Sequence, residues 1–258
     1  MKFAIIGAGN MGGAIALGLL RSGACPAAEL CVSRTHAGLP KALAGCGIQA
    51  FTDNRAAVAG AACVVLAVKP HLACRVLGEV AEALEPGALL LSVAANVSLG
   101  ALQAALGART DIALARAMPN TAVALGEGVT AVAAASPEAV ERARAVLAPL
   151  GLCVAVDEAR FGAVTALSGC GIAHALRFLR AAQEAGVEMG LGAAQAGEIF
   201  AQTMRGAAAL VLAGGHAEAE VDRVCTPGGL TIRGLNALER AGFTGAVVQG
   251  LLASQPEA

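Results

Sequence analysis

The sequence predicts an α/β protein with two domains, residues 1–157 and residues 158–258. Three observations support this prediction. Short apolar runs alternate with helical patterns up to about residue 155, which is typical of a parallel sheet with crossover helices. After Asp157 this alternation stops, and the pattern is mainly helical as far as Leu252. Finally, a glycine-rich turn directly follows the first expected strand.

The first domain contains the expected strands and most of the motifs. Strands are expected at Phe3–Ile6, Leu30–Ser33, Cys63–Val68, Ala88–Val93, Ile112–Ala115, Val129–Ala133 and Cys153–Val156. Helices are expected around Met11–Ser22, Leu72–Leu84, Leu99–Leu106 and Pro137–Leu147. The last of these begins with Ser136 at the N-cap position, Pro137 at the first helical position and Glu138 in the first turn.

The second domain is expected to be all helical, with helix breaks at its glycine-rich points. These are Gly169–Gly171, Gly190–Gly192, Gly214–His216 and Thr226–Gly229. A helical half this small and apolar does not bury its own faces, so we expect residues 158–258 to form an intertwined homodimer.

The composition favours a small-molecule partner. The 258 residues are 57% hydrophobic and carry a formal net charge of −1, so no basic stripe is expected to bind a nucleic acid. The chain has no Trp or Tyr on which bases would stack. Its eight cysteines form no CxxC pair and are interpreted as buried thiols of a cytoplasmic protein. No metal site is expected, because the four histidines lack metal-helix spacing.

No membrane association is expected either. Two uncharged stretches, 3–20 and 86–108, superficially resemble a signal peptide and a membrane span. Both are interrupted by glycines and polar residues, so we interpret them as strand, loop and helix.

The turn after the first strand predicts a dinucleotide-binding site of the Rossmann type. It has the pattern G-x-G-x-x-G, from Gly7 through Gly9, Asn10 and Met11 to Gly12. In such a turn the first glycine permits the bend, the second lets a pyrophosphate approach the backbone, and the third allows close helix packing. The amides at the start of the following helix then bind the anion.

The end of the second strand indicates which nicotinamide cofactor is preferred. An acidic residue there would bind the ribose 2′-hydroxyl group, but this chain has Ser33, Arg34 and Thr35. A guanidinium between two hydroxyls suits a 2′-phosphate, so NADP(H) is expected to be preferred, with NAD(H) kept as the alternative. Arg34 as an ordinary solvated loop residue also stays open.

Six segments together resemble the pyrroline-5-carboxylate reductase family, over nearly the whole chain. They are the GAGNMG turn at Gly7–Gly12, AVKP at Ala67–Pro70, SVAA at Ser92–Ala95, MPNT at Met118–Thr121, AVTALSG at Ala163–Gly169 and TPGGLTIRGLNALERAGFTGAV at Thr226–Val247. The last segment is the most specific. The resemblance implies a Rossmann-type NAD(P)-binding domain and a C-terminal helical dimerisation domain that interlocks with a second subunit, with dimers that often form rings.

The resemblance also implies site residues and an activity. The cofactor-binding residues would include Asn54, Ala67, Val68, Lys69, Pro70, Val93, Ala94 and Ala95. Those around the substrate would be Glu158, Thr165, Thr226, Gly228, Gly229 and Thr231. The implied activity is NADPH-dependent reduction of 1-pyrroline-5-carboxylate to L-proline. Lys69 as an exposed strand-end lysine, and Asn120 as part of a plain turn, are kept as alternatives to functional roles.

The turn that contains Pro227, Gly228 and Gly229 has a physical interpretation of its own. It precedes a helical run, so the amides from Gly229 to Thr231 are expected to be free donors at a positive helix end, where a small carboxylate binds. We expect the Thr231 hydroxyl to lie near the imine nitrogen and to orient it, which makes Thr231 the candidate catalytic residue.

Departures from the family pattern leave the imine open. Where the family has SGSGPAY, this chain has Cys170, Ile172 and His174 at the serine, proline and tyrosine positions, and Ala122 and Leu230 also depart from the common residues. His174 is either a new acid or base or a satisfied histidine on a buried helix. The alternatives are a paralogous reductase of a different imine, a non-catalytic nucleotide-binding regulator, and a hydroxyacid dehydrogenase. The last lacks a convincing catalytic Lys or His motif in the helical half.

Overall fold

The computed structural model describes residues 1–35 and 38–255. The chain divides into two compact units, Met1–Gly169 and Cys170–Ala258, which are described separately. Residues 158–169 have their contacts within the first unit, because Phe161 is buried there against Met118, Ala131 and Ala133. The domain boundary expected at 157/158 remains a prediction.

The first unit contains one eight-stranded sheet with the order β3-β2-β1-β4-β5-β6-β7-β8. The strands are β1 (Phe3–Ile6), β2 (Leu30–Ser33), β3 (Gln49–Phe51), β4 (Cys63–Leu66), β5 (Leu89–Ser92), β6 (Ala113–Pro119), β7 (Gly128–Ala134) and β8 (Gly151–Ala155). The first six strands in this order are parallel, and their arrangement is that of a Rossmann fold.

One junction of this mainly parallel sheet is antiparallel, which the sequence did not indicate. β6 and β7 pair antiparallel, with Met118 opposite Ala131, and β8 then runs parallel to β7. The physical reason is the short connection at residues 120–127, which holds only a 3-10 turn, Thr121–Leu125. A parallel return needs a crossover of a dozen or more residues.

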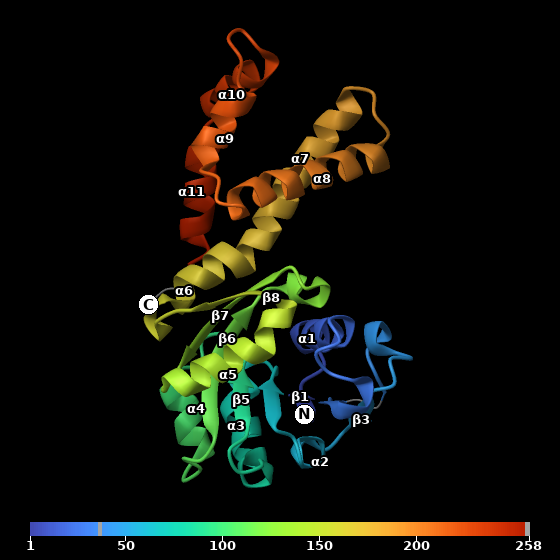
Figure 1. The fold of residues 1–258 in the computed structure, drawn as a ribbon, viewed down its shortest axis with the longest axis vertical. Coiled ribbons are helices and arrows are strands. Elements are labelled where there is room, and N and C mark those ends of the chain that lie inside the picture. Colours follow the sequence, from blue (N-terminus) through green and yellow to red (C-terminus); the bar gives the residue numbers. More distant parts are fainter. Residues whose placement is uncertain (36–37, 256–258) are drawn as a thin grey trace. The chain divides into compact units, whose positions relative to one another are not determined.

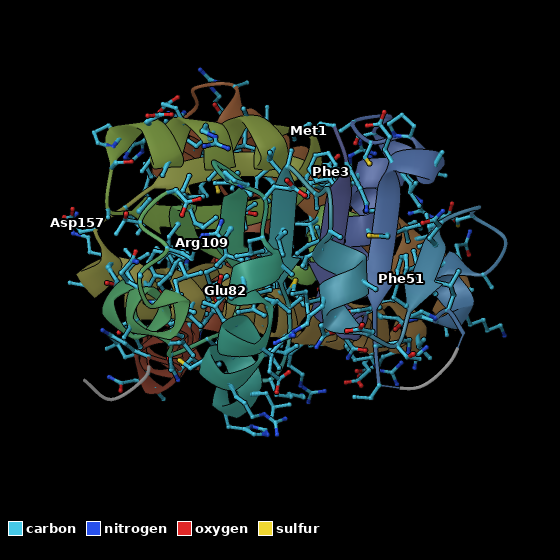
Figure 2. All side chains as sticks on the ribbon, turned by 90° about the horizontal axis from the view of Figure 1, so that it is seen from below. Met1, Phe3, Phe51, Glu82, Arg109 and Asp157 are labelled. Atoms are coloured by element: carbon cyan, nitrogen blue, oxygen red, sulfur yellow. The ribbon has the colours of Figure 1, made fainter. Side chains whose placement is uncertain are left out.

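Helices cover both faces of this sheet (Figure 1, Figure 2). One face packs against α1 (Asn10–Arg21) and α5 (Pro137–Leu147), and the other packs against α2 (Asn54–Val58), α3 (Pro70–Val80) and α4 (Leu99–Leu106). Further 3-10 turns lie at Ala27–Glu29, Lys41–Leu43, Ala81–Ala83, Ala148–Leu150 and Glu158–Arg160. β3 and α2 were not expected from the sequence, because neither has a clear apolar period.

The helical part begins with a single continuous helical stretch. α6 (Phe161–Val164) passes through a π-helical segment (Thr165–Cys170) into α7 (Gly171–Glu188). The expected break at Gly169–Gly171 is therefore wrong, since the wider π turn accommodates the glycines without ending the helix. π segments of this kind are frequent at functional sites.

The second unit continues with four more helices. They are α8 (Ala193–Leu212), α9 (Ala217–Val224), α10 (Leu230–Arg240) and α11 (Phe243–Ala253). The other three expected breaks are confirmed. A further break at Gly242, which has φ of +82°, separates α10 from α11 and was not expected.

Within its described residues, the second unit has almost no core of its own. Only Gly186 and Ala196 are buried, whereas many large apolar side chains are exposed. The stretch Glu158–Glu188 is the one helix in the described part of the chain that could cross a membrane by length and composition alone. This is weak support for a span, because apolar helices that pack against another chain present the same kind of surface.

The cysteines of the first unit include two strongly buried thiols. Burial raises the pKa of Cys63 to about 12, and burial together with the nearby Glu29 raises the pKa of Cys25 to about 11. Thiols in this state are protonated at neutral pH and behave as small apolar groups.

Candidate active site

A cavity of about 760 Å³ lies at the carboxyl ends of the parallel strands. Its walls come from the loops that follow β1, β2, β3, β4 and β5. The strand order reverses between β1 and β4, and open α/β sheets bind their ligands at such a switch point. The adenosine half of a dinucleotide would therefore lie toward β2 and the nicotinamide half toward β5.

The glycine turn fits a pyrophosphate. Gly7 has φ of +97°, and a Cβ atom there would lie 2.7 Å from the carbonyl oxygen of Ala67. A Cβ atom on Gly12 would lie 2.1 Å from the carbonyl oxygen of Gly7, so the helix packs too closely for any side chain. A Cβ atom on Gly9 would meet nothing within 4 Å. The open space at Gly9 is where an anion can approach the backbone.

The start of α1 offers unpaired backbone donors to that anion. Gly9 occupies the N-cap position, no side chain of residues 1–35 and 38–255 caps the helix, and its first turn contains no acidic residue. The positive end of the helix dipole and the free amides of Asn10 and Met11 therefore face the cavity that these residues line.

The wall of the cavity next to β2 contains the residues expected to choose the cofactor. Ser33 donates its hydroxyl hydrogen bond to Oδ1 of Asn54 at 2.7 Å. The backbone amide of Arg34 is held by the carbonyl of Phe51 at 3.0 Å, and its guanidinium makes a long 3.4 Å contact with the carbonyl of Gly38. Arg34 lines the cavity, where its guanidinium can approach a phosphate.

The structure brings nearly all the expected cofactor residues into this one cavity. Every one lines it except Gly12, which lies behind the turn: Gly7, Gly9, Asn10, Met11, Ser33, Arg34, Asn54, Ala67, Val68, Lys69, Pro70, Val93, Ala94 and Ala95. Lys69 is exposed at the N-cap position of α3. The sequence did not indicate Arg75, which also lines the cavity.

Two of the expected substrate residues lie in the first unit. The Oε1 atom of Glu158 accepts hydrogen bonds from Nη1 of Arg116 and from the amide of Leu99, both at 2.7 Å. The Thr165 hydroxyl donates to the carbonyl of Phe161 at 2.7 Å, within the helical stretch. Arg116 was missed from the sequence, because an arginine inside an apolar strand gives no motif.

Asn120 has a structural environment that favours the plain-turn interpretation. It is buried, and its Oδ1 atom accepts from the amide of Ala122 at 3.2 Å, while its Nδ2 atom donates to the carbonyl of Ser168 at 3.3 Å. These bonds hold the β6–β7 turn and the π-helical segment together.

The other expected substrate residues lie together at the turn between α9 and α10. The amide of Gly229 donates to the carbonyl of Thr226 at 2.9 Å, and Gly228 has φ of +70°. In the part of the chain that the structure describes, no side chain caps α10, so the first amides of this helix, at Leu230 and Thr231, are free donors. Thr231 is exposed and its hydroxyl has no hydrogen-bond partner among residues 1–35 and 38–255.

His174 is not on a buried helix in the isolated chain. It is exposed on α7, and its Nε2 atom lies 3.5 Å from Oγ of Ser254. The interpretation as a buried, satisfied histidine is therefore wrong for the single chain, because the second unit has no core around α7.

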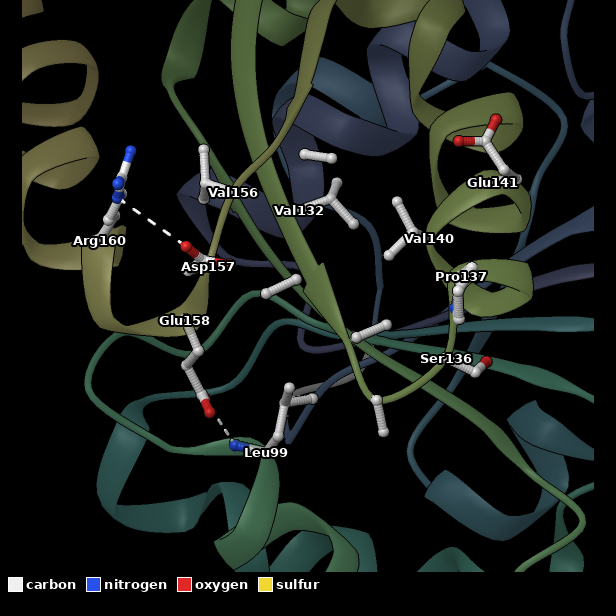
Figure 3. A pocket seen from close by; sticks show the side chains of 14 residues that line it. Leu99, Val132, Ser136, Pro137, Val140, Glu141, Val156, Asp157, Glu158 and Arg160 are labelled. Carbon is white, nitrogen blue, oxygen red and sulfur yellow. Dashed lines mark hydrogen bonds and ion pairs between the residues drawn. The ribbon is translucent and has the colours of Figure 1, made fainter.

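A second cavity, of about 590 Å³, lies between β7, β8 and the starts of α4 and α5 (Figure 3). Its floor includes Val132, Val140 and Val156, and Glu158 reaches across its edge toward Leu99. Sequence reasoning did not indicate it. No group of three potential metal-ligating side chains gathers in the part of the chain that the structure describes.

The Rossmann sheet, the glycine turn and the cavity at the strand switch define a dinucleotide-binding domain joined to a helical unit, the architecture of an NAD(P)-dependent oxidoreductase. Residues 2–96 match the family described as NADP oxidoreductase, coenzyme F420-dependent, and residues 158–258 match the one described as pyrroline-5-carboxylate reductase dimerisation.

Individual relatives are similar to this chain over nearly its whole length. Pyrroline-5-carboxylate reductase of Escherichia coli (strain K12) is 34% identical over 97% of this chain and 94% of its own length. Pyrroline-5-carboxylate reductase 1 of Dictyostelium discoideum is 33% identical over 99% of this chain, which spans about half, 49%, of that relative. The crystal structure of a Plasmodium falciparum pyrroline carboxylate reductase with NADP bound aligns with a TM-score of 0.86 and 25% identity, covering 98% of this chain and 95% of that one. The chain belongs to the pyrroline-5-carboxylate reductase family.

Proposed function

We propose that this protein catalyses the NADPH-dependent reduction of 1-pyrroline-5-carboxylate to L-proline. The observation that carries the proposal is the cavity at the β1/β4 switch, where a glycine turn open to an anion stands beside the Arg34 guanidinium. The names of the relatives supply the substrate, and the NADP in the Plasmodium falciparum structure supports the choice of cofactor.

The residues of this chain have binding and orienting roles. The free amides at the start of α10 bind the substrate carboxylate. The Thr231 hydroxyl lies near the imine nitrogen and orients the C=N group for reduction. When bound, NADPH supplies the hydride that adds to this carbon, and a proton from water on the nitrogen completes the amine. An unperturbed hydroxyl is a poor acid, so Thr231 acts by orientation.

The chain functions as a homodimer, in this proposal, with each site completed by both chains and with dimers that assemble further into rings. The match of residues 158–258 to a dimerisation family and the exposed apolar helices of the second unit support an oligomer. The reducing state that the free cysteines suggest is consistent with a cytoplasmic location.

A panel of imines tests the reaction and its substrate. Purified protein is mixed with NADPH and either 1-pyrroline-5-carboxylate or other cyclic and acyclic imines, and oxidation is followed at the nicotinamide absorbance. We expect 1-pyrroline-5-carboxylate to give the highest kcat/KM. A higher value for another imine would assign the departures at Cys170, Ile172 and His174 to a changed substrate. NADPH binding without turnover of any imine would favour the regulator.

Arg34→Asp should weaken NADPH more than NADH. Loss of a charge-assisted contact with the 2′-phosphate costs about 1.5 to 3 kcal/mol, so the KM for NADPH should rise by roughly tenfold or more. The KM for NADH should change little. Arg142→Asp changes the charge equally, but at the amino edge of the sheet, where Arg142 donates to the carbonyl of Gly87, and is the control. Equal KM changes for both cofactors in Arg34→Asp would show that the arginine is solvated.

Thr231→Ala should lower kcat and kcat/KM together while NADPH affinity stays unchanged. This pattern marks an interaction made in the transition state. The loss of transition-state stabilisation should be about 1 kcal/mol, or up to about 3 kcal/mol if a charged partner is left unpaired. A higher KM with an intact kcat would instead mean that the hydroxyl anchors the carboxylate. Thr203→Ala, on α8, where the hydroxyl bonds the carbonyl of Ile199, is the control.

A further inference from the structure

Arg116 is an unusual residue for its position. It lies in the middle of β6, it is only 6% exposed, and its guanidinium stacks over the Phe161 ring at 4.6 Å from the ring centroid. Its register partner on β5 is Ser92, whose buried hydroxyl has no partner among the described residues. A charged group is therefore held in the middle of an otherwise apolar strand.

Stability alone does not account for the Arg116–Glu158 pair. An apolar pair of similar volume is often as stable as a buried ion pair, because taking two charges out of water is costly. A buried pair can instead define one geometry among several.

The pair fixes the start of α4. The same Oε1 atom of Glu158 that accepts from Arg116 also accepts from the amide of Leu99, the first residue of α4. Figure 3 shows the bond from Glu158 to Leu99. A second cap comes from Ser98, whose hydroxyl accepts from the amide of Ala101 at 3.1 Å. With two caps, the first turn of α4 has a defined position relative to β6.

The loop that ends at this cap is the wall of the dinucleotide cavity. Val93, Ala94 and Ala95 follow β5 directly and line the cavity, and the amide of Val93 is held by the carbonyl of Leu66 at 3.0 Å. The next residue, Asn96, has φ of +59° and is the one described non-glycine residue with a positive φ. A short loop in this conformation, fixed at both ends, transmits a shift of α4 to its cavity-lining residues.

We propose that Arg116 and Glu158 are positioning residues for the nicotinamide half of the cofactor. They hold the start of α4, and through it the Val93–Ala95 wall on the β5 side of the cavity, where the nicotinamide half lies. Among the described residues, no hydrogen bond or ion pair joins this pair to Ser33, Arg34 or Asn54 next to β2. The inference rests on the proposed function for the cofactor, and it changes the expected role of Glu158 from substrate binding to positioning.

The test compares two ligands in four proteins. The ligands are NADPH and adenosine 2′,5′-bisphosphate, which contains only the adenosine half, and both are titrated by calorimetry. The proteins are the wild type, Arg116→Met, the double variant Arg116→Met/Glu158→Met, and Arg109→Met. Arg109 is the matched control, because it pairs with Asp111 at 2.8 Å and bonds the carbonyls of Ala81 and Leu84 before β6 begins.

We expect both Arg116 variants to bind NADPH roughly tenfold more weakly, to bind adenosine 2′,5′-bisphosphate as the wild type does, and to lose about 100-fold in kcat, as a small misplacement of reacting groups would cause. Arg109→Met should bind both ligands normally. Urea unfolding should show that the double variant regains stability relative to Arg116→Met, since the half-buried Glu158 carboxylate no longer stands unpaired. Its NADPH affinity should stay low, because replacing Glu158 removes the acceptor of the Leu99 amide.

The outcomes separate the inference from the proposed function. Recovery of NADPH affinity together with stability in the double variant would mean that the pair is merely structural. Equal weakening of both ligands, or unchanged NADPH binding, would also overturn the inference. Should Arg116→Met fail to fold, the double variant alone decides between these results. A wild-type protein that does not bind NADPH would instead contradict the proposed function.

Discussion

Gly12→Ala should nearly abolish NADPH binding. The new Cβ atom would lie 2.1 Å from the carbonyl oxygen of Gly7 and 3.1 Å from the Cβ atom of Ala67, so α1 has to move away from the turn. Forcing a methyl group into a packed site typically costs about 1 to 3 kcal/mol of folding free energy, and here the neighbour is backbone that cannot rotate away. A shift of about 1 Å in the anion-binding amides should reduce NADPH affinity by on the order of 100-fold.

Gly13→Ala is the matched control one residue further along the same helix. A Cβ atom on Gly13 would meet nothing within 4 Å, and Gly13 does not line the cavity. Alanine is the better helix former, so this variant should gain up to about 1 kcal/mol of stability with unchanged NADPH affinity. Calorimetric titration and urea unfolding of both variants check the prediction. Tight NADPH binding by Gly12→Ala would show that the turn can relax and does not set the position of the anion.

The part of the site predicted most completely from sequence is the part that is local along the chain. The turn at Gly7–Gly12, Arg34 and the loops at Ala67–Pro70 and Val93–Ala95 each follow an expected strand, and parallel strands bring their carboxyl ends to one edge. Their positions follow from strand order alone. Their meeting in one cavity could therefore be predicted with little knowledge of side-chain packing.

The parts that were missed depend on contacts between distant segments. The pairing of Arg116 with Glu158 joins β6 to the residues after β8, and neither residue has a periodic or motif signal. The reversal of β7 follows from a connection too short for a crossover, which could have been noticed in the sequence from the lengths between strands. The π-helical segment that contains Gly169 depends on a wider pattern of backbone hydrogen bonds, which the glycine content does not indicate.

Val248→Asp should dissociate the oligomer. Val248 lies in the middle of α11, which contains no charged side chain from Phe243 to Ala253, and it is 47% exposed in the single chain. A helix of this composition is stable in water when another surface covers it. In a twofold interface the substitution occurs twice, so two unpaired carboxylates would be buried together.

Burying an uncompensated charge should weaken the free energy of association by about 3 kcal/mol or more, which raises the dissociation constant by on the order of 100-fold. Light scattering with refractive-index detection measures the mass, since a chain without Trp or Tyr barely absorbs at 280 nm. Gln249→Asp, at the next position of α11, adds the same charge at an exposed polar side chain and should leave the mass unchanged.

Because the second unit buries almost nothing by itself, the wild type should unfold at a temperature that rises with protein concentration, whereas Val248→Asp should unfold at a lower temperature. A wild-type protein that stays monomeric with full activity, or a Val248→Asp variant with wild-type mass and stability, would mean that α11 is not covered by a second chain.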